Sequence, residues 1–309
     1  MINLVLVFYP IKPWRRFRTF FELFYDIFDV HHNMTPKFTQ FLANENHLSI
    51  LAMHPHAIIP LQAFIWSAFC DRFIPQFYGV GATSDQALRL PIVRHILLYL
   101  SVGSAHKDVI LHSMQTDDHN LFILPGGVAE IFLSQRHSEK DGSASGPYIQ
   151  SIKARRYGLM KLALQTGAAI FPMYAFGATD VFDQLMPVKK GSTVSKKSHN
   201  LSSLVDYLSE AMESISRRVH GGLTLYWGRY FLPIPHNPKL TLVMADPIYP
   251  VPGTTGWNEN GTKKTCKKIP NPTPEQVEEL MERYVDALHR LFEQYKVQAG
   301  YPNDILDIV

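Results

Sequence analysis

The sequence contains only two cysteines, Cys70 and Cys266, among its 309 residues. Two thiols exclude a disulfide-stapled scaffold and a thiolate zinc site, and they fit a reducing compartment. Charged residues are also scarce, at 18% against about a quarter in an average protein. The formal net charge is only +3, so no dense basic field is available. We therefore exclude nucleic acid as a partner.

The N-terminal residues lack an apolar run of the roughly 20 residues that a membrane-spanning helix needs. The apolar start, residues 1–8, is interrupted by Pro10, Lys12 and the arginines that follow. It also lacks the basic start and small-residue cleavage site of a signal peptide. Residues 14–28 mix arginines with aromatic residues. This composition is typical either of a surface helix packed on the core or of an interfacial membrane segment.

Short apolar runs alternate with helical patterns over the rest of the chain. This alternation predicts an α/β fold with a mostly parallel sheet flanked by helices. Strands are expected at 49–53, 77–80, 121–124, 169–175, 223–227 and 240–245, and helices at 58–70, 86–100, 153–165 and 201–218.

The last helix has the clearest start signal in the chain. Thr273 is its expected N-cap, Pro274 takes the first helical position, and Gln276 completes a capping box. Apolar residues then recur on one face as far as Tyr295, which indicates a helix packed on the core. Earlier in the chain, Gly167 is placed as the stop of the helix at 153–165.

His54, Pro55 and His56 follow the first predicted strand. Ligands of open α/β sheets bind at strand ends, and Pro55 biases His54 toward extended geometry. A single histidine in such a place is usually structural. Two histidines that flank a proline favour a functional site, with a satisfied structural role as the alternative.

A second candidate segment runs from Leu124 to Glu130, with the sequence LPGGVAE. Gly126 and Gly127 let backbone N–H groups approach a ligand or an oxyanion. Glu130 stands at an expected helix start, where a carboxylate is either functional or merely a partner of the helix dipole.

Three basic residues, Lys153, Arg155 and Arg156, precede Tyr157 and Gly158. Basic residues oppose the dipole at a helix start, so an anion site is as good an interpretation as a solvated first turn, and arginine suits phosphate. A metal site is not expected, because no third ligand at a recognisable spacing follows His54 and His56.

At these residues the sequence resembles the type-2 diacylglycerol acyltransferase family, which includes mono- and diacylglycerol acyltransferases and wax synthases within the glycerolipid acyltransferase superfamily. The resemblance runs from about residue 46 to residue 309 and is carried by blocks that occur in the family's order. Residues 54–57 resemble its His-Pro-His-Gly signature, and residues 124–134 resemble its Gly-Gly-x-x-Glu segment. Residues 155–176 resemble its Arg-x-Gly-Phe-x-Lys-x-Ala block. Residues 245–248 resemble its Gly-Glu-Pro-Ile motif, and residues 272–309 resemble its C-terminal helix and tail.

Two departures from the family pattern affect the expected site. Ala57 replaces the signature glycine, which costs roughly 1 kcal/mol if that position needs a positive φ. The wider superfamily pairs its catalytic histidine with an aspartate five residues on. Here that position is Ile59, so Glu130 is the expected partner of His54.

The resemblance implies transfer of a fatty acyl group from acyl-CoA to the hydroxyl of diacylglycerol. His54 is the expected general base, and His56 either orients His54 or donates to the oxyanion. Backbone N–H groups near Gly126 and Gly127 are the expected oxyanion donors. The CoA phosphates are assigned to Arg155 and Arg156, together with Lys153. No cofactor is expected, since acyl-CoA is a co-substrate.

The acceptor stays open between diacylglycerol, monoacylglycerol and a long-chain alcohol. A non-catalytic lipid-binding protein and a hydrolase that uses water are the alternatives of other classes. The expected partners are acyl-CoA, the lipid alcohol and membrane lipid, with a homo-oligomer left open.

The resemblance also implies a location on the cytosolic face of the endoplasmic reticulum membrane, with the lipid droplet as a second location. Residues 1–45 are expected to form a membrane-associated segment, and residues 46–309 the acyltransferase domain. Because the family's N-terminal membrane spans are not found here, we expect either that the N-terminus is truncated or that the protein contacts the membrane through 1–28 and apolar surface such as 58–70.

Overall fold

The computed structural model describes residues 29–34, 47–73, 79–133, 137–138, 148–184, 225–253, 255–257 and 264–309. Two expected features, the arginine–aromatic segment 14–28 and the helix at 201–218, lie outside these residues.

A seven-stranded sheet forms the centre of the molecule, in the order β1-β11-β8-β2-β5-β3-β4. Five of its six neighbouring strand pairs are parallel, and only β11 with β8 is antiparallel. The predicted α/β fold with a mostly parallel sheet is confirmed. The strands are His31–Met34 (β1), Ser49–His54 (β2), Gly79–Thr83 (β3), Val102–Ser104 (β4), Asn120–Ile123 (β5), Ala169–Phe176 (β8) and Thr241–Met244 (β11).

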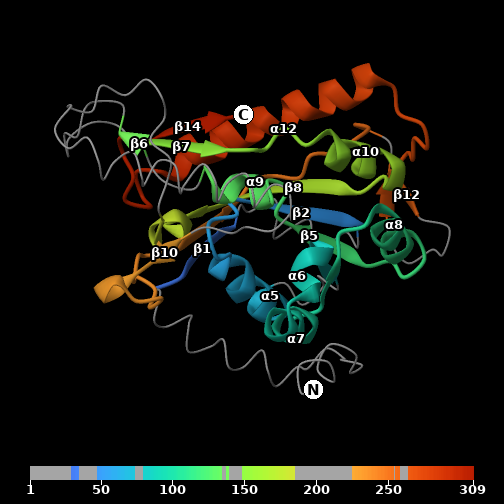
Figure 1. The fold of residues 1–309 in the computed structure, drawn as a ribbon. Coiled ribbons are helices and arrows are strands. Elements are labelled where there is room, and N and C mark those ends of the chain that lie inside the picture. Colours follow the sequence, from blue (N-terminus) through green and yellow to red (C-terminus); the bar gives the residue numbers. More distant parts are fainter. Residues whose placement is uncertain are drawn as a thin grey trace, which may run out of the picture.

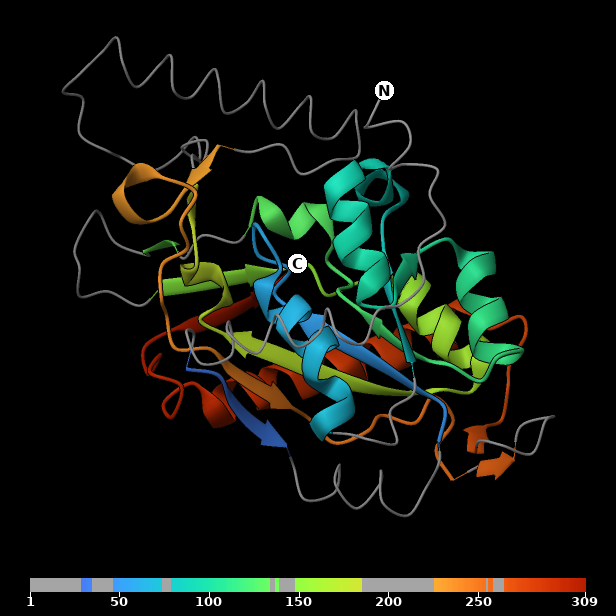
Figure 2. The same cartoon turned by 90° about the horizontal axis from the view of Figure 1, so that it is seen from below.

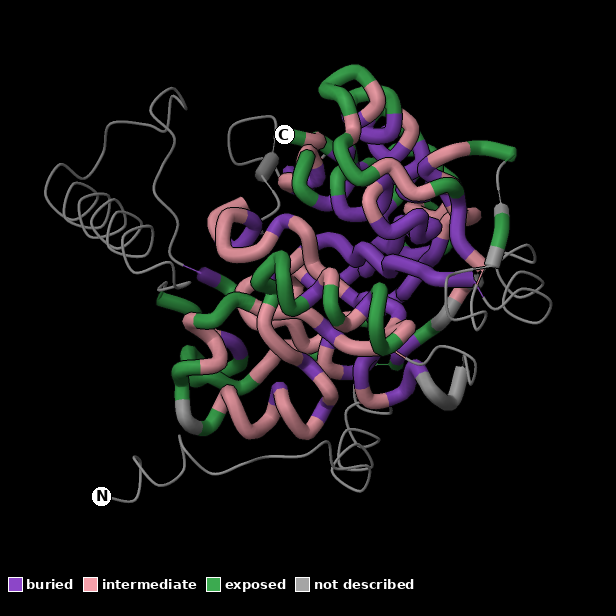
Figure 3. Tube along the Cα trace, turned by 90° about the vertical axis from the view of Figure 1, so that its right-hand side faces the viewer, coloured by how far each residue is buried: buried purple, intermediate pink, exposed green. Residues whose placement is uncertain are grey.

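Helices cover both faces of this sheet, so the molecule has three layers (Figure 1). One hydrophobic cluster packs α8, α10 and α12 against the sheet, and a second packs α5 and α7 against the opposite face. The buried residues gather along the strands between the helices (Figure 3). The helices are Leu61–Phe73 (α5), Asp85–Arg89 (α6), Pro91–Tyr99 (α7), Lys107–Gln115 (α8), Val128–Ile131 (α9), Tyr157–Thr166 (α10) and Pro274–Tyr295 (α12).

Strand β2 lies at the middle of the sheet and contributes to both clusters. Ile50 and Ala52 belong to the cluster under α10 and α12, whereas Leu51 and Met53 belong to the cluster under α5 and α7. Side chains alternate between the faces of a strand. This alternation places the side chain of His54 on the face of Ile50 and Ala52.

Three small sheets and two short 3₁₀ turns complete the described fold. Two of these sheets are antiparallel strand pairs, β9 with β10 and β12 with β13, and the third carries the C-terminal strand β14 beside β7. Their strands are His137–Ser138 (β6), Tyr148–Ile152 (β7), Asp183–Gln184 (β9), Tyr226–Trp227 (β10), Thr255–Trp257 (β12), Lys264–Cys266 (β13) and Ile305–Ile308 (β14), and the 3₁₀ turns are Ala178–Asp180 (η1) and Arg229–Phe231 (η2).

The predicted helix signals at Thr273 and Gly167 are confirmed. The Thr273 side chain accepts from the amide of Gln276, and the Gln276 side chain accepts from the amide of Thr273, which completes the capping box. Gly167 closes α10 in the left-handed conformation, with a φ of 69°. The helix expected from residue 153 starts only at Tyr157, because β7 extends through Ile152.

Helix α5 is not the exposed apolar surface that the sequence suggested for residues 58–70. Its side chains of Ile65 and Trp66 are 0% and 1% exposed, because they pack against the sheet in the second cluster. That part of the membrane expectation is wrong. Within the described residues, none of the helices has both the length and the apolar character needed to cross a bilayer.

Candidate active site

His54 is the last residue of β2, and Pro55 and His56 lie in the turn that leads from β2 to α5. The turn is tied to the start of α5 by Gln62, whose amide nitrogen donates to the carbonyl oxygens of Pro55 (2.8 Å) and His56 (3.2 Å). Ala57 follows with a φ of 57°, so the position does require the left-handed conformation that glycine adopts without strain. The strain foreseen for an alanine at this position is therefore present.

His54 is completely buried, and both of its ring nitrogens have partners. Its Nδ1 lies 2.6 Å from Glu130 Oε1, and its Nε2 lies 3.1 Å from the Tyr284 hydroxyl. Because the carboxylate only accepts, Nδ1 donates its proton to Glu130, while Nε2 shares its hydrogen bond with the Tyr284 hydroxyl. The expected pairing of His54 with Glu130 is confirmed, but no ring nitrogen of His54 is left for a substrate.

Glu130 is the centre of the site. Its Oε1 also accepts from the Lys153 amide (2.9 Å), and its Oε2 accepts from the His56 amide (2.6 Å). Burial alone would raise the pKa of Glu130, but the nearby His54 and the hydrogen bonds from His54 and His56 outweigh it, so the pKa is lowered. The carboxylate therefore stays ionised and joins β2, α9 and the end of β7.

Gly126 makes room for this carboxylate. A Cβ at position 126 would overlap the side chain of Glu130, so only glycine fits while Glu130 holds its partners. Gly127 serves a different purpose, since it starts α9 with a φ of 55° and a ψ of −150°. That conformation is essentially reserved for glycine.

His56 differs from His54 in the hydrogen-bond partners of its ring nitrogens. Its Nδ1 lies 2.8 Å from the carbonyl oxygen of Ala57, which only accepts, so the proton sits on Nδ1 and the neutral ring has its lone pair on Nε2. Burial lowers the pKa of His56, and the Ala57 carbonyl and Glu130 only partly offset this effect. The ring is thus held neutral, with one nitrogen able to accept a proton.

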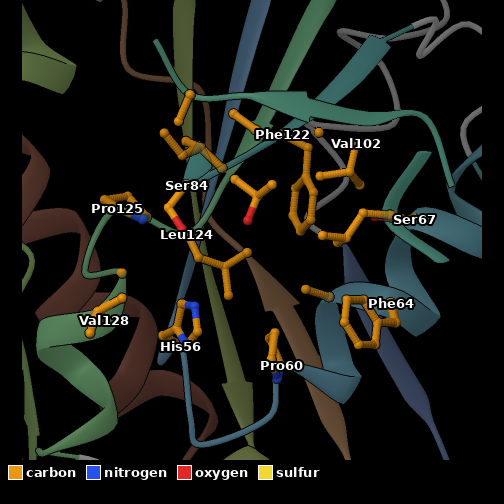
Figure 4. A pocket seen from close by; sticks show the side chains of 18 residues that line it. His56, Pro60, Phe64, Ser67, Ser84, Val102, Phe122, Leu124, Pro125 and Val128 are labelled. Carbon is orange, nitrogen blue, oxygen red and sulfur yellow. The ribbon is translucent and has the colours of Figure 1, made fainter. Parts of the chain in front are cut away.

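His56 lines a cavity of about 260 Å³ on the α5 face of the sheet. Most of the other lining side chains are apolar, and Figure 4 shows the His56 ring at one edge of the cavity, between Val128 and Pro60, with Phe64 and Phe122 across from it. The cavity is also lined by Ser67, Ser84, Leu97, Val102, Leu124 and Gly127. An apolar cavity beside a neutral histidine suits a lipid substrate and a proton transfer.

Of the two glycines expected to supply oxyanion donors, Gly127 lines the same cavity, whereas Gly126 is not among its lining residues. Gly127 lines the cavity, yet its N–H donates to the Leu124 carbonyl at 3.2 Å. The carbonyl of Gly126 accepts from Arg156. These two hydrogen bonds fix the backbone turn at Gly126 and Gly127. That the N–H groups of the turn donate to the oxyanion stays a prediction.

The basic residues expected to bind CoA phosphates already have partners in the protein. Arg155 Nη1 lies 2.7 Å from Glu282 Oε1 on α12, and this partner raises the pKa of Arg155. Arg156 donates from Nε to the Pro125 carbonyl (3.0 Å) and from Nη2 to the Gly126 carbonyl (2.5 Å). Arg156 thus supports the glycine turn, and Lys153 contributes its backbone amide to Glu130. Their phosphate-binding role stays a prediction.

Sequence reasoning missed two residues of this site, Tyr284 and Gln62. Tyr284 appears in the sequence only as one member of the apolar stripe of α12. A buried tyrosine on such a stripe needs a partner for its hydroxyl, and this was the available signal. Gln62 is a polar residue inside an apolar helix pattern, which is a comparable signal. As for metals, the described part of the chain contains no cluster of three or more His, Cys, Asp or Glu side chains.

Comparison with known proteins shows which family this chain resembles. A family model described as diacylglycerol acyltransferase matches residues 11–308. Diacylglycerol O-acyltransferase 2-like protein 6 of Mus musculus is 30% identical over 94% of this chain and 77% of its own length. Diacylglycerol O-acyltransferase 2 of Dictyostelium discoideum is 27% identical, over 92% and 73%. Acyl-CoA wax alcohol acyltransferase 1 of Mus musculus is 28% identical, over 82% and 68%.

The family match spans His54, His56, Glu130 and the C-terminal helix that supplies Tyr284. These three relatives are named as acyltransferases, of either diacylglycerol or a wax alcohol. The chain therefore belongs to the diacylglycerol acyltransferase family and is an acyltransferase of lipid metabolism, of the diacylglycerol acyltransferase 2 and wax synthase kind.

Proposed function

We propose that this protein transfers a fatty acyl group from acyl-CoA to the free hydroxyl of diacylglycerol, forming triacylglycerol. The observation that carries the proposal is the neutral His56 at the edge of an apolar cavity, with its Nδ1 held by the Ala57 carbonyl. Such a histidine can activate an alcohol, and apolar walls can hold an acceptor that has no charge.

The base in this mechanism is His56, in place of the His54 favoured by the sequence. Its Nε2 accepts the hydroxyl proton as the alcohol oxygen attacks the thioester carbonyl carbon. The new C–O bond forms, the C–S bond breaks, and the proton passes to the CoA thiolate. Glu130 keeps the His56 backbone in place through the His56 amide, and His54 and Tyr284 keep the Glu130 carboxylate in place.

Diacylglycerol is chosen as acceptor because several relatives carry it in their names. A long-chain alcohol is the second candidate, since other relatives at similar identity are named for wax alcohol. Monoacylglycerol is the third candidate acceptor. We further propose that the reaction takes place at the cytosolic face of the endoplasmic reticulum membrane, with lipid droplets as a second location, because these acceptors do not dissolve in water.

One assay tests the acceptor and the reaction together. Radiolabelled acyl-CoA is incubated with the purified chain and, separately, with diacylglycerol, monoacylglycerol, a long-chain alcohol or no acceptor, and the products are separated by chromatography. We expect labelled triacylglycerol as the dominant product, formed roughly 10²–10⁴-fold more slowly by His56→Ala. Free fatty acid that forms equally without acceptor would mean a hydrolase. Bound label with no turnover would mean a lipid-binding protein.

A further inference from the structure

An aromatic loop, defined here as residues 225–234 (LYWGRYFLPI), projects from the body of the protein. Seven of its ten residues are Leu, Ile, Tyr, Trp or Phe. Tyr230 and Phe231 are 85% and 84% exposed, more than any other large hydrophobic residue that the structure describes. Figures 1 and 2 both show the loop, in orange beside β10, at the left margin of the molecule.

The loop is held in one shape by its own backbone. The Gly228 amide donates to the Leu232 carbonyl (2.7 Å), and the Arg229 amide donates to the Ile234 carbonyl (2.8 Å). A side chain at Gly228 would overlap the Ile234 carbonyl. The exposed aromatic residues are thus presented by a closed loop, which reduces the conformational entropy that ordering on a partner would otherwise cost.

The backbone at the tip of the loop is strained. Tyr230 and Phe231 have φ values of 59° and 58°, in the region that bulky residues rarely adopt. Two neighbouring aromatic residues in this conformation cost free energy without any compensating burial in the protein. Strain of this kind concentrates where a segment has a function.

The charge of the loop matches an anionic lipid surface. Arg229 stands at the tip beside the aromatic residues, and no Asp or Glu occurs between residues 225 and 245. Tyrosine and tryptophan are enriched at membrane interfaces, where a ring lies among the headgroups and a neighbouring arginine contacts phosphate. A protein partner of acidic character would explain Arg229, but would not explain the unshielded aromatic residues around it.

The loop is also connected to the active site. Strand β10 at its start pairs with β9, where Tyr226 lies opposite Gln184. The Gln184 side chain donates to the carbonyl oxygen of Ile131 at 2.9 Å, and Ile131 follows Glu130 in α9. The loop is therefore linked to the helix that carries the site carboxylate through the β9–β10 strand pair and the Gln184 side chain.

From these observations we propose that the aromatic loop inserts Tyr230 and Phe231 into the boundary between headgroups and acyl chains of an anionic lipid surface, with Arg229 on the phosphates. The lipid surface is then the source of the acceptor, and in this respect the inference rests on the proposed function. The binding itself is independent of turnover, so the two can fail separately.

A site-directed fluorophore tests the insertion. Cys70 and Cys266 are both buried, so an environment-sensitive dye reports on a new surface cysteine, and the unsubstituted chain serves as the blank. Phe231→Cys is labelled and mixed with vesicles of equal parts phosphatidylcholine and phosphatidylserine. We expect a blue-shifted, brighter emission that acyl-chain-brominated lipids quench. Val109→Cys is the matched control, since Val109 is 50% exposed on α8, at the opposite margin in Figures 1 and 2, and should not respond.

A second variant measures how much the loop contributes to the free energy of binding to vesicles. Tyr230→Ser with Phe231→Ser should lower the partition coefficient onto the same vesicles by roughly tenfold or more, because two aromatic side chains lose their burial in lipid. Val109→Ser should leave it unchanged. A dye at position 231 that ignores vesicles while the chain still pellets with them would overturn the proposal. So would a dye response that depends only on protein concentration, which would mean that a second copy covers the loop.

Vesicle binding is measured without acyl-CoA, so its outcome stands even if the acceptor assay shows no transfer. If transfer occurs in detergent micelles but the loop fails both vesicle tests, the proposed function survives and this inference falls.

Discussion

His54 and His56 differ, at the scale of single residues, in what their ring nitrogens can still bind. His54 has Glu130 on one nitrogen and Tyr284 on the other, whereas His56 has a partner only on Nδ1 among the residues described. A general base needs a free lone pair within reach of the substrate. The assignment of the base to His56 follows from this difference.

His56→Ala should lower kcat by roughly 10²–10⁴-fold, the range for a positioned acid–base group, with a much smaller change in the KM for acyl-CoA. Steady-state kinetics with the preferred acceptor measures both constants. His54→Ala is the comparison, and it should lower the melting temperature as well, because Glu130 and Tyr284 lose a buried partner. Full activity of His56→Ala, with His54→Ala inactive but normally folded, would return the base to His54.

The pH dependence of the rate offers a second test of the same residue. The base works only when deprotonated, and burial lowers the pKa of His56 below the usual 6.5. The rate should therefore hold as pH falls through 6.5 and decline only at lower pH. A profile of kcat/KM against pH measures this limb. A decline that begins above pH 6.5 would contradict the assignment.

Ala57 carries a cost that one substitution can remove. Its φ of 57° disfavours any residue with a Cβ, and Ala57→Gly should raise the free energy of unfolding by about 1 kcal/mol after the extra flexibility of the unfolded glycine is deducted. Urea denaturation of the two proteins measures the difference. Equal or lower stability of the glycine variant would show that the alanine is not strained.

Gly126 tests the close approach of Glu130. Gly126→Ala places a methyl group where the carboxylate now lies, so the carboxylate must leave its three donors, and both kcat and stability should fall sharply. Gly158→Ala is the control, because its added Cβ meets nothing within 4 Å and alanine favours the helix. Activity and melting temperature of the pair measure the effect, and equal behaviour of the two variants would refute it.

At the scale of secondary-structure elements, helix α12 has two separate roles, one in stability and one at the active site. Its start carries the capping box at Thr273, and its middle presents the Tyr284 hydroxyl to His54. Thr273→Ala should cost about 1 kcal/mol of stability without altering the pH profile. Tyr284→Phe should cost about 1–3 kcal/mol, because His54 Nε2 is left buried without a partner, and should also lower kcat. Denaturation and pH–rate profiles of both variants distinguish the tasks. A Tyr284→Phe variant that matches Thr273→Ala in every measurement would mean that the hydroxyl only packs.

Several helices and strands follow from the sequence because their signals are local, whereas β1, β4 and α8 were not predicted and the helix expected at 86–100 is divided into α6 and α7. The capping box of α12, the glycine stop of α10 and the alternation of apolar runs with helical patterns each depend on a few neighbouring residues. The pairing of His54 with Glu130 was also expected, from the motif order. The face on which His54 points was not, because it depends on which side of β2 receives α12 and which receives α5. That choice is made by packing between distant segments, and the same packing hides Trp66 in the core.

The buried carboxylate contributes to stability at the scale of the whole molecule. Because its pKa is lowered below the usual value of 4.5, Glu130 contributes stability that is fully present above that value and is lost as pH falls through its folded pKa. The free energy of unfolding should therefore drop more steeply in acid for the parent protein than for Glu130→Gln, which does not titrate. Denaturation at several pH values measures the difference between the two curves. Parallel curves would mean that Glu130 is not ionised in the fold.

The positions of the partners of His54 in the sequence determine when the site can form during synthesis. Glu130 follows the histidine by 76 residues and Tyr284 by 230, so a chain emerging from the ribosome has the nucleus of the site long before it has the hydroxyl that completes it. Until α12 has emerged, α8 and α10 can pack on this face of the central sheet, but Tyr174 and Phe176 lack the cover that Phe292 of α12 provides. A nascent chain at this stage is inactive and prone to aggregation. A premature stop before residue 274 should therefore yield an aggregating fragment without turnover, and not an enzyme of reduced activity.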